Sequence, residues 1–276
     1  MLLRSEQYPL ALDMFQQAVR IRRGARGRNH AEVAISLVKV GIAQLLLRKF
    51  DEALFSFREA LSTRRHALGH LHPSTARIYN NIGCVHIEFN EVREARRAFE
   101  AALDIQRDAI CHEPDNVQMS FSAATTLCNL AYLYTHRGMH SKASLVLKEA
   151  MSLQEKVIGT HHPTSLSTLD CLADSYAQSE DLHKAINCYN ELAIRLERRG
   201  DNEFGPNERK QRALGITYYK MSRIYQQQND LEAFIKVLKR SALCVRELGS
   251  PELIKNIEVE IKKAEEQISS NVMDWL

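Results

Sequence analysis

The chain has 276 residues, 45% of them apolar and 26% charged, which is typical of a folded chain rather than a disordered one. Its 37 basic and 34 acidic residues leave a formal charge of +3, too small to make nucleic acid or a membrane surface the main partner. No run of about 18 apolar residues and no signal-peptide pattern occurs, so we expect no membrane insertion and a cytoplasmic location. The six cysteines form no C-x-x-C pair, which favours reduced thiols over a metal site.

A pattern of small and large side chains recurs along the whole chain. An alanine is followed four positions later by an aromatic or aliphatic side chain, and the spacing from one such alanine to the next is near-regular. Copies of this kind indicate a repeat protein, in which each unit packs on its neighbours. The pairs are Ala11 and Phe15, Ala53 and Phe57, Ala95 and Phe99, Ala143 and Leu147, Ala185 and Tyr189, and Ala233 and Val237.

Each unit is predicted to be two helices joined by a short turn. Apolar residues at helical spacing precede each alanine and form one stripe of a first helix, and the alanine itself belongs to the second helix. A small residue recurs in that stripe, as Gly41, Gly83, Ala131 and Ala173. Glycine inside a helix costs about 1 kcal/mol relative to alanine. We therefore expect Gly41 and Gly83 to allow a close helix–helix approach, facing the first alanine of the second helix.

The units at the ends of the chain, and two in the middle, depart from the pattern. The sequence opens with a turn and a second helix, which indicates either a fragment of a longer protein or a dispensable first helix. Repeats three and five carry six extra residues each, so their first helices should begin early. In this alignment the last repeat is one residue short between Tyr225 and Ala233. After Pro251 a charged amphipathic helix should cap the array, which gives about five and a half repeats at 1–250 and a capping helix with its tail at 251–276.

Histidines cluster where one unit passes into the next. His30, His72 and His162 fall at one position of the repeat, and a proline follows two of them. Proline suits the first turn of a helix, and Gly69 and its counterpart in the later junction suit a helix end with positive φ. No further ligands lie at short spacing. The histidines therefore predict helix junctions rather than a metal site.

The spacing of small, aromatic and small residues resembles the tetratricopeptide repeat, whose usual period is about 34 residues. The period of 42, the LGxxHP-type junctions, and the segments NNIG at 80–83 and CNLAYLY at 128–134 resemble the kinesin light chain version of that repeat. The resemblance covers roughly residues 5–248 and implies an all-α, right-handed superhelix (α-solenoid) of antiparallel helix pairs. HEAT repeats have an overlapping period of about 40–47 residues, but small residues at fixed register and the histidine–proline junction argue against them.

The resemblance implies a non-catalytic scaffold or adaptor that binds an extended peptide or short helix of a partner in a concave groove. A cargo adaptor like kinesin light chain is the leading specific version, although the sequence holds no heptad region for docking a motor chain. The alternative is a regulatory or nucleic-acid-associated module of a larger, truncated multidomain protein. The basic run at 20–28 favours a solvated loop, because no aromatic residue is interleaved for base stacking. No phosphate loop, HExxH or GxSxG motif occurs, so we expect no enzyme, no catalytic residue, no cofactor and no small-molecule substrate.

The inner faces of the first helices supply the candidate groove. In tetratricopeptide domains an asparagine at the position of Asn81 and Asn129 often holds the backbone of a peptide, because an amide donates and accepts at once. The charge of the groove changes along the array, from basic in repeats one and two to acidic in repeat four. This change would orient a partner that is acidic at one end. The alternative is a solvated polar face. The candidates are Lys39, Arg77, Asn80, Asn81, Thr125, Asn129, Tyr132, Asp170 and Asp174.

Two further comparisons concern known ligands of this kind of repeat. The clamp that binds chaperone carboxylates is not matched, because Thr125 or Ser167 stands where a lysine is needed. The C-terminal Met273-Asp274-Trp275 resembles the tryptophan-acidic cargo peptides that kinesin light chains bind. One hypothesis is that this tail occupies a groove of the same chain or of a second copy. The alternative is that Trp275 packs onto the capping helix.

Overall fold

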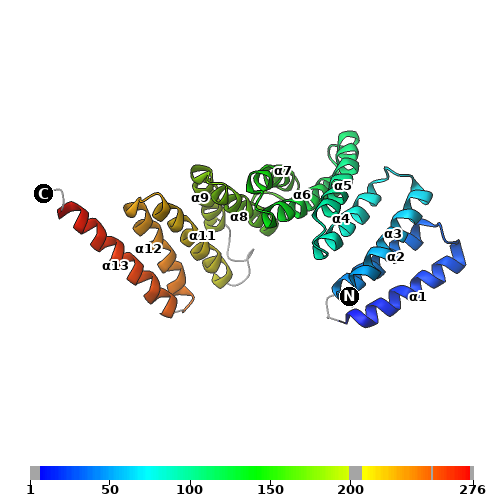
Figure 1. The fold of residues 1–276 in the computed structure, drawn as a ribbon, viewed down its shortest axis with the longest axis horizontal. Helices are drawn as coiled ribbons and strands as arrows, with labels where there is room; N and C mark the ends of the chain where they lie inside the picture. The colour runs from blue at the N-terminus through cyan, green and yellow to red at the C-terminus, as the bar shows by residue number, and fades with distance from the viewer. Residues whose placement is uncertain (1–6, 199–206, 250, 274–276) are drawn as a thin grey trace. The chain divides into compact units, whose positions relative to one another are not determined.

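The computed structural model describes residues 7–198, 207–249 and 251–273, and every regular element in these ranges is an α-helix. The chain forms two compact units, residues 1–138 and 139–276. Among the described helices, none combines the length and the apolar character that crossing a membrane requires. The first unit (Figure 1) holds α1 (Tyr8–Arg26), α2 (Ala31–Leu46), α3 (Phe50–Leu68), α4 (Pro73–Glu88), α5 (Val92–His112) and α6 (Val117–His136). The second holds α7 (His140–Ile158), α8 (Pro163–Gln178), α9 (Leu182–Arg198), α11 (Asn207–Gln227), α12 (Leu231–Glu247) and α13 (Pro251–Met273).

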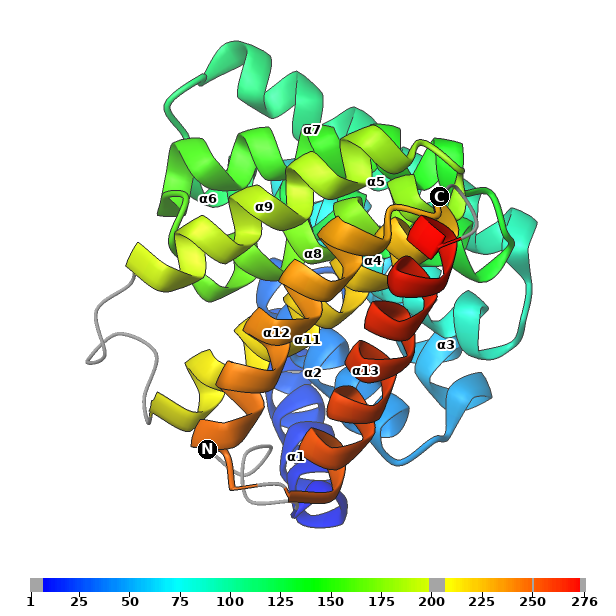
Figure 2. The same cartoon turned by 90° about the vertical axis from the view of Figure 1, so that its left-hand side faces the viewer.

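Helices that follow one another in the sequence pack against one another within each unit. In the first unit, α2 also contacts α4, and α4 contacts α6, so the first helices of neighbouring repeats are adjacent. In the second unit, α11, α12 and α13 lie next to one another in both views (Figures 1 and 2). The predicted all-α architecture of stacked helix pairs is confirmed for both units.

The two glycines of the first helices face an aromatic ring. A Cβ added to Gly41 would lie 2.6 Å from Cε1 of Phe57, and one added to Gly83 would lie 2.5 Å from Cε1 of Phe99. The predicted close approach is therefore present, but its partner is wrong: the phenylalanine, and not the alanine four residues before it, fills the space. Phe57 is completely buried, as is Ala53.

The lengths of the first helices follow the extra residues seen in the sequence. Helices α2, α4 and α8 have 16 residues, whereas α6 has 20 and α11 has 21. The prediction that the first helices of the third and fifth repeats begin early is confirmed.

The expected deletion in the last repeat is wrong. Helix α12 begins at Leu231, six positions after Tyr225, just as α3 begins six positions after Gln44. The residue in register with Ala53 is thus Phe234, which is 2% exposed, and not Ala233. The buried Ser241 stands at the second small position and donates a hydrogen bond to the carbonyl of Gly215 at 2.9 Å. The last repeat therefore keeps its length and replaces one small residue by a ring.

The junction histidines are helix N-caps. The Nδ1 atoms of His30, His72 and His162 each accept a hydrogen bond at 3.2 Å from the backbone N–H two residues later. This bond satisfies one of the free N–H groups of the first turn. Gly69 and its counterparts before the other two caps have φ between +81° and +89°. The interpretation of these residues as helix junctions is confirmed.

The helix predicted after Pro251 packs against α12. Ile257, Ile261 and Ala264 of α13 are buried in one apolar cluster with Phe234 and Leu238 of α12. This contact covers the apolar face that α12 would otherwise expose to water.

Candidate functional site

Seven of the nine predicted groove residues lie in the first unit, on the first helices α2, α4 and α6. The other two, Asp170 and Asp174, lie on α8 of the second unit. Lys39, Arg77, Thr125 and Tyr132 are exposed, whereas the three asparagines are half-buried. The first unit thus carries most of the candidate surface.

Asn129 connects two neighbouring first helices. Its Nδ2 donates to Oδ1 of Asn80 at 3.1 Å and to Sγ of Cys84 at 3.7 Å. Burial and the charge of Glu88 raise the pKa of Cys84 to about 11, so its thiol is neutral at physiological pH. The amide donors of Asn129 are therefore used inside the protein, and a role in holding a peptide backbone does not follow from its position alone.

Lys220 makes the same kind of connection in the second unit. Its Nζ lies 2.8 Å from Oδ1 of Asp170 and 2.8 Å from Oδ2 of Asp174, while the hydroxyl of Tyr189 donates to Asp174. Burial raises the pKa of Asp170, and the hydrogen bond and charge of Lys220 oppose that rise. The single positive charge of Lys220 offsets one of the two negative charges, so the predicted acidic end of the groove carries less net charge than the sequence indicates.

These two contacts share one register. Asn129 and Lys220 each stand two positions before the small residue of their helix, which is Ala131 or Ser222. Each bonds the residues at the same two positions of the preceding first helix, three before and one after its small residue. The array thus has a repeated polar link between first helices.

Asn81 stands at this register but lacks such a link. The corresponding residues of α2 are Val38 and Ile42, which offer no side-chain acceptor. The Nδ2 of Asn81 is out of contact with solvent and has no hydrogen-bond partner among the described residues. A buried donor left unpaired costs about 1–3 kcal/mol, so this amide gains most from an acceptor supplied by another molecule.

A row of apolar side chains runs along α2 next to this position. Ile35 and Leu46 are 40% and 43% exposed, and Val38 and Ile42 between them are half-buried. They are spaced by three and four residues, which places them on one face of the helix. The neighbouring Lys39 lies with its Nζ 5.7 Å from the ring centroid of Phe15. This face is apolar and carries a cation at its edge.

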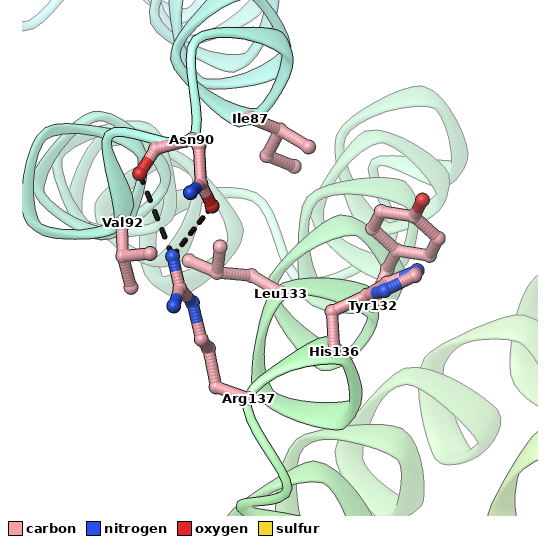
Figure 3. Close-up of a pocket in the computed structure, with 7 residues that line it drawn as sticks. All are labelled: Ile87, Asn90, Val92, Tyr132, Leu133, His136 and Arg137. Atoms are coloured by element: carbon pink, nitrogen blue, oxygen red, sulfur yellow. Dashed lines mark hydrogen bonds between the residues drawn. The ribbon is translucent and has the colours of Figure 1, made fainter.

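A hollow of about 250 Å³ lies at the C-terminal ends of α4 and α6 (Figure 3). The rings of Tyr132 and His136 lie edge to face with their centroids 4.1 Å apart, and Tyr132 is 52% exposed. Arg137 closes one side by donating to Oδ1 of Asn90 at 2.6 Å and to its carbonyl at 3.5 Å. The remaining wall is apolar and consists of Ile87, Val92 and Leu133. Such a hollow suits an apolar or aromatic side chain.

Sequence reasoning found Tyr132 but missed the turn residues beside it. Asn90 has a φ of +60°, and it stands at the position of Arg48, Glu180 and Asn229, which share this left-handed conformation. The available sequence signal was the residue type at this turn position, since Asn90, Gly138 and Asn229 are of the types that favour a positive φ. Thr125, by contrast, donates to the carbonyl of Phe121 at 3.0 Å and brings no free donor to the surface.

The predicted loop for the basic run at 20–28 is wrong for most of its length, because residues 20–26 form the last turns of α1. Three of its five arginines form ion pairs within the first unit. Arg22 and Arg26 pair with Glu32, and Arg23 pairs with Glu59. These pairs reduce the positive charge available to phosphates, and Arg20 and Arg28 remain without an ion pair among the described residues. In the described part of the chain, no group of three or more His, Cys, Asp or Glu residues could hold a metal ion.

The chain consists of long helix pairs whose two helices pack closely at small residues, and the pairs stack on one another. This arrangement defines an α-solenoid of helical hairpins. A tetratricopeptide repeat model matches residues 1–66, 56–108 and 122–193, and a second model of the same repeat matches residues 216–242. The chain therefore belongs to the tetratricopeptide repeat family.

Three solved structures have similar folds. BtubC (BKLC) of P. vanneervenii has a TM-score of 0.67 at 14% identity, over 88% of this chain and 92% of that one. A putative kinesin light chain of Podospora anserina with nearly identical TPR-like repeats has a TM-score of 0.62 at 17% identity, over 79% and 98%. YrrB, a TPR protein with an unusual peptide-binding site, has a TM-score of 0.53 at 15% identity, over 85% and 93%. No curated protein matches the sequence. The fold is thus that of a tetratricopeptide protein with long repeats of the kinesin light chain type.

Proposed function

We propose that this protein is a non-catalytic interaction scaffold that holds an extended peptide or short helix of a partner on the first-helix face of its first unit. The observation that carries the proposal is the exposed apolar row on α2 with the unpaired amide of Asn81 next to its centre. Apolar side chains of the partner would cover Ile35 and Leu46. One of its carbonyl groups would accept from Asn81 once the amide turns toward it.

The charges next to this face favour a partner with an acidic group. Lys39 lies on α2 and the exposed Arg77 on α4, and neither forms an ion pair among the described residues. Asp170 and Asp174 attract a basic segment less strongly than two unpaired carboxylates would, because they share the positive charge of Lys220. Complementary charge would orient the partner and speed its association more than it would raise affinity.

A peptide selection tests the location of this surface. Peptides are selected from a random library with the full chain, and their affinities are measured for Asn81→Ala and Ile35→Ser. The matched control is Ile216→Ser, since Ile216 has the same register on α11 and is 50% exposed. We expect both first-unit variants to bind at least about fivefold more weakly, with the control unchanged. Weakening by the control alone would place binding elsewhere and refute the proposal.

A cargo-adaptor role like that of kinesin light chains is the narrower version. It is supported by the repeat length and by the fold shared with the putative kinesin light chain of Podospora anserina. A synthetic peptide with one tryptophan between acidic residues should then bind the full chain and lose affinity in Asn81→Ala. Absence of binding would reject the cargo-adaptor role. The broader scaffold proposal would then depend on the result of the peptide selection alone.

The C-terminal tail remains a separate prediction. Asp274 and Trp275 lie outside the described residues. If the tail occupies a binding face of the same chain or of a second copy, deleting residues 271–276 should raise the affinity for a selected peptide. An unchanged affinity would refute that hypothesis.

A further inference from the structure

An arginine of the first unit is buried without a partner. Arg64, on α3, is only 8% exposed. Its Nε is out of contact with solvent and has no hydrogen-bond partner, and no carboxylate among the described residues forms an ion pair with it. A guanidinium cannot lose its proton at physiological pH. Burial of its Nε without an acceptor is therefore unfavourable.

The repeat shows what Arg64 lacks. Arg22 stands one repeat earlier, at the same register, and its guanidinium donates to Oγ of Ser36 at 2.7 Å and to the carbonyl of Glu32 at 3.2 Å. Gln106 stands one repeat later and donates to Oγ1 of Thr126 at 3.1 Å. At this register, the side chain of the second helix bonds a polar residue of the next first helix in both neighbouring repeats.

In the second repeat the acceptor has been replaced. Ile78 stands where the other repeats have Ser36 and Thr126, and it is 1% exposed in the apolar core. Ser74, one turn earlier, shares its hydroxyl with Nδ1 of the junction residue His72 at 2.7 Å. Arg64 therefore has hydrogen-bond donors like those of Arg22 and Gln106, but Ile78 cannot accept from them as Ser36 and Thr126 do.

A second cation stands on α4, the helix that packs on α3 after the junction. Arg77, next to Ile78 on α4, is exposed and has no ion pair or hydrogen bond among the described residues. Burial and the positive charge of Arg77 lower the pKa of Arg64. The adjacent Arg65 differs, because it donates to the hydroxyl of Tyr79 and lies 5.4 Å from that ring's centroid. Two neighbouring guanidinium groups repel each other unless an anion binds between them.

We propose that Arg64 and Arg77 together bind an oxyanion, a carboxylate or phosphate group carried by the partner protein. Guanidinium groups hold such groups through paired, charge-assisted hydrogen bonds. The inference rests on the proposed function, because Arg77 belongs to the predicted groove and the anion belongs to the molecule held there. It adds Arg64, on a second helix, and it assigns the acidic group of the partner to the second repeat.

The test is an anion titration of the full chain without any peptide. Sodium phosphate or sodium acetate is added at constant ionic strength, and the arginine Nε–Hε signals are followed by nuclear magnetic resonance. The variants are Arg64→Gln and Arg77→Gln, and the matched control is Arg22→Gln, whose arginine is already paired. Glutamine is the natural residue at this register in the next repeat, as Gln106.

We expect saturable binding by the wild type, a loss of affinity of about tenfold in Arg64→Gln and Arg77→Gln, and no change in Arg22→Gln. Binding of phosphate alone would indicate a phosphorylated partner, and binding of acetate as well would indicate an aspartate or glutamate. If Arg64→Gln fails to fold, Arg77→Gln decides, since only an exposed side chain changes. Equal affinity of Arg77→Gln and wild type, or no saturable binding, overturns the site. A failed peptide selection alone would count against the scaffold proposal and not against the anion site.

Discussion

Phe57 occupies the space in which Gly41 would carry a side chain, since a Cβ built there would lie 2.6 Å from the phenylalanine Cε1. Alanine favours a helix by about 1 kcal/mol relative to glycine, but overpacking a filled core costs about 1–3 kcal/mol. We therefore expect Gly41→Ala to lower the free energy of unfolding by up to about 2 kcal/mol, as measured by urea denaturation. Gly215→Ala is the matched control, because its nearest contact would be an ordinary 3.4 Å to Cβ of Cys244. That control should be neutral or stabilising.

A second variant identifies the cause. Ala131 and Leu147 stand at the registers of Gly41 and Phe57, so the chain itself pairs alanine with leucine in another repeat. Adding Phe57→Leu to Gly41→Ala should cost less than the sum of the two single changes, by about 0.5–3 kcal/mol for residues in contact. Strict additivity would mean that the ring is not what excludes the Cβ.

The same pair shows how far the sequence alone determines the fold. Repeat spacing predicted the helices, their pairing and a close approach at Gly41. It could not say whether Ala53 or Phe57 faces the glycine, because residues four apart share one face of a helix. For the last repeat, the choice of Ala233 followed residue type, whereas the turn and the buried Phe234 fix the register one position later.

The candidate site was predicted only in part for a related reason. Register placed Asn81 and Asn129 at equivalent positions of the first helices, and this is what the structure has. Their hydrogen bonds depend on the residues of the preceding repeat, so Asn129 is bonded to Asn80 while the Asn81 donor has no partner among the described residues. A single-repeat pattern contains no information on that pairing. Arg64 was missed for the same reason, since its special feature is a partner that another repeat has and this one lacks.

The two asparagines should therefore respond differently to truncation. Asn129→Ala removes the bond to Asn80 and should lower the free energy of unfolding by about 0.5–1.5 kcal/mol. Asn81→Ala removes an amide donor without a partner in the described part of the chain, and should leave stability unchanged or raise it slightly. Thermal and urea unfolding of both variants provide the measurement. If Asn81→Ala destabilised the chain as much as Asn129→Ala, its amide would be part of the packing and not of a binding face.

The junction histidines offer a test of capping. His72→Ala removes the acceptor for the N–H of Ser74 and should destabilise the chain by about 0.5–1 kcal/mol. His72→Asn should retain most of the stability, because asparagine is among the best N-cap residues. His70→Ala, at an exposed residue two positions earlier, serves as the control. Equal losses in His72→Ala and His72→Asn would show that something other than the cap matters at this position.

The last prediction concerns the ion pairs of Lys220 with Asp170 and Asp174. Lys220→Met keeps the aliphatic stem and removes the charge that opposes the effect of burial on Asp170. At neutral pH the variant should be less stable by about 1–2 kcal/mol, less than for a fully buried pair because solvent screens partly exposed groups. Lys239→Met is the control, since Lys239 and Glu265 are both exposed, at 57% and 49% of their side chains. It should change stability by less than about 0.5 kcal/mol.

The pH dependence of this difference distinguishes an ion pair from a packing effect. Burial already raises the pKa of Asp170 above its ordinary value of 3.8, and loss of Lys220 should raise it further. A carboxyl whose pKa is higher in the folded state favours folding below its unfolded pKa, and that contribution is lost as the pH rises through the folded value. The deficit of Lys220→Met should thus be complete at neutral pH and shrink as the pH falls toward 3.8. Urea denaturation of both proteins across this range measures it, and a deficit independent of pH would mean that Lys220 acts through packing alone.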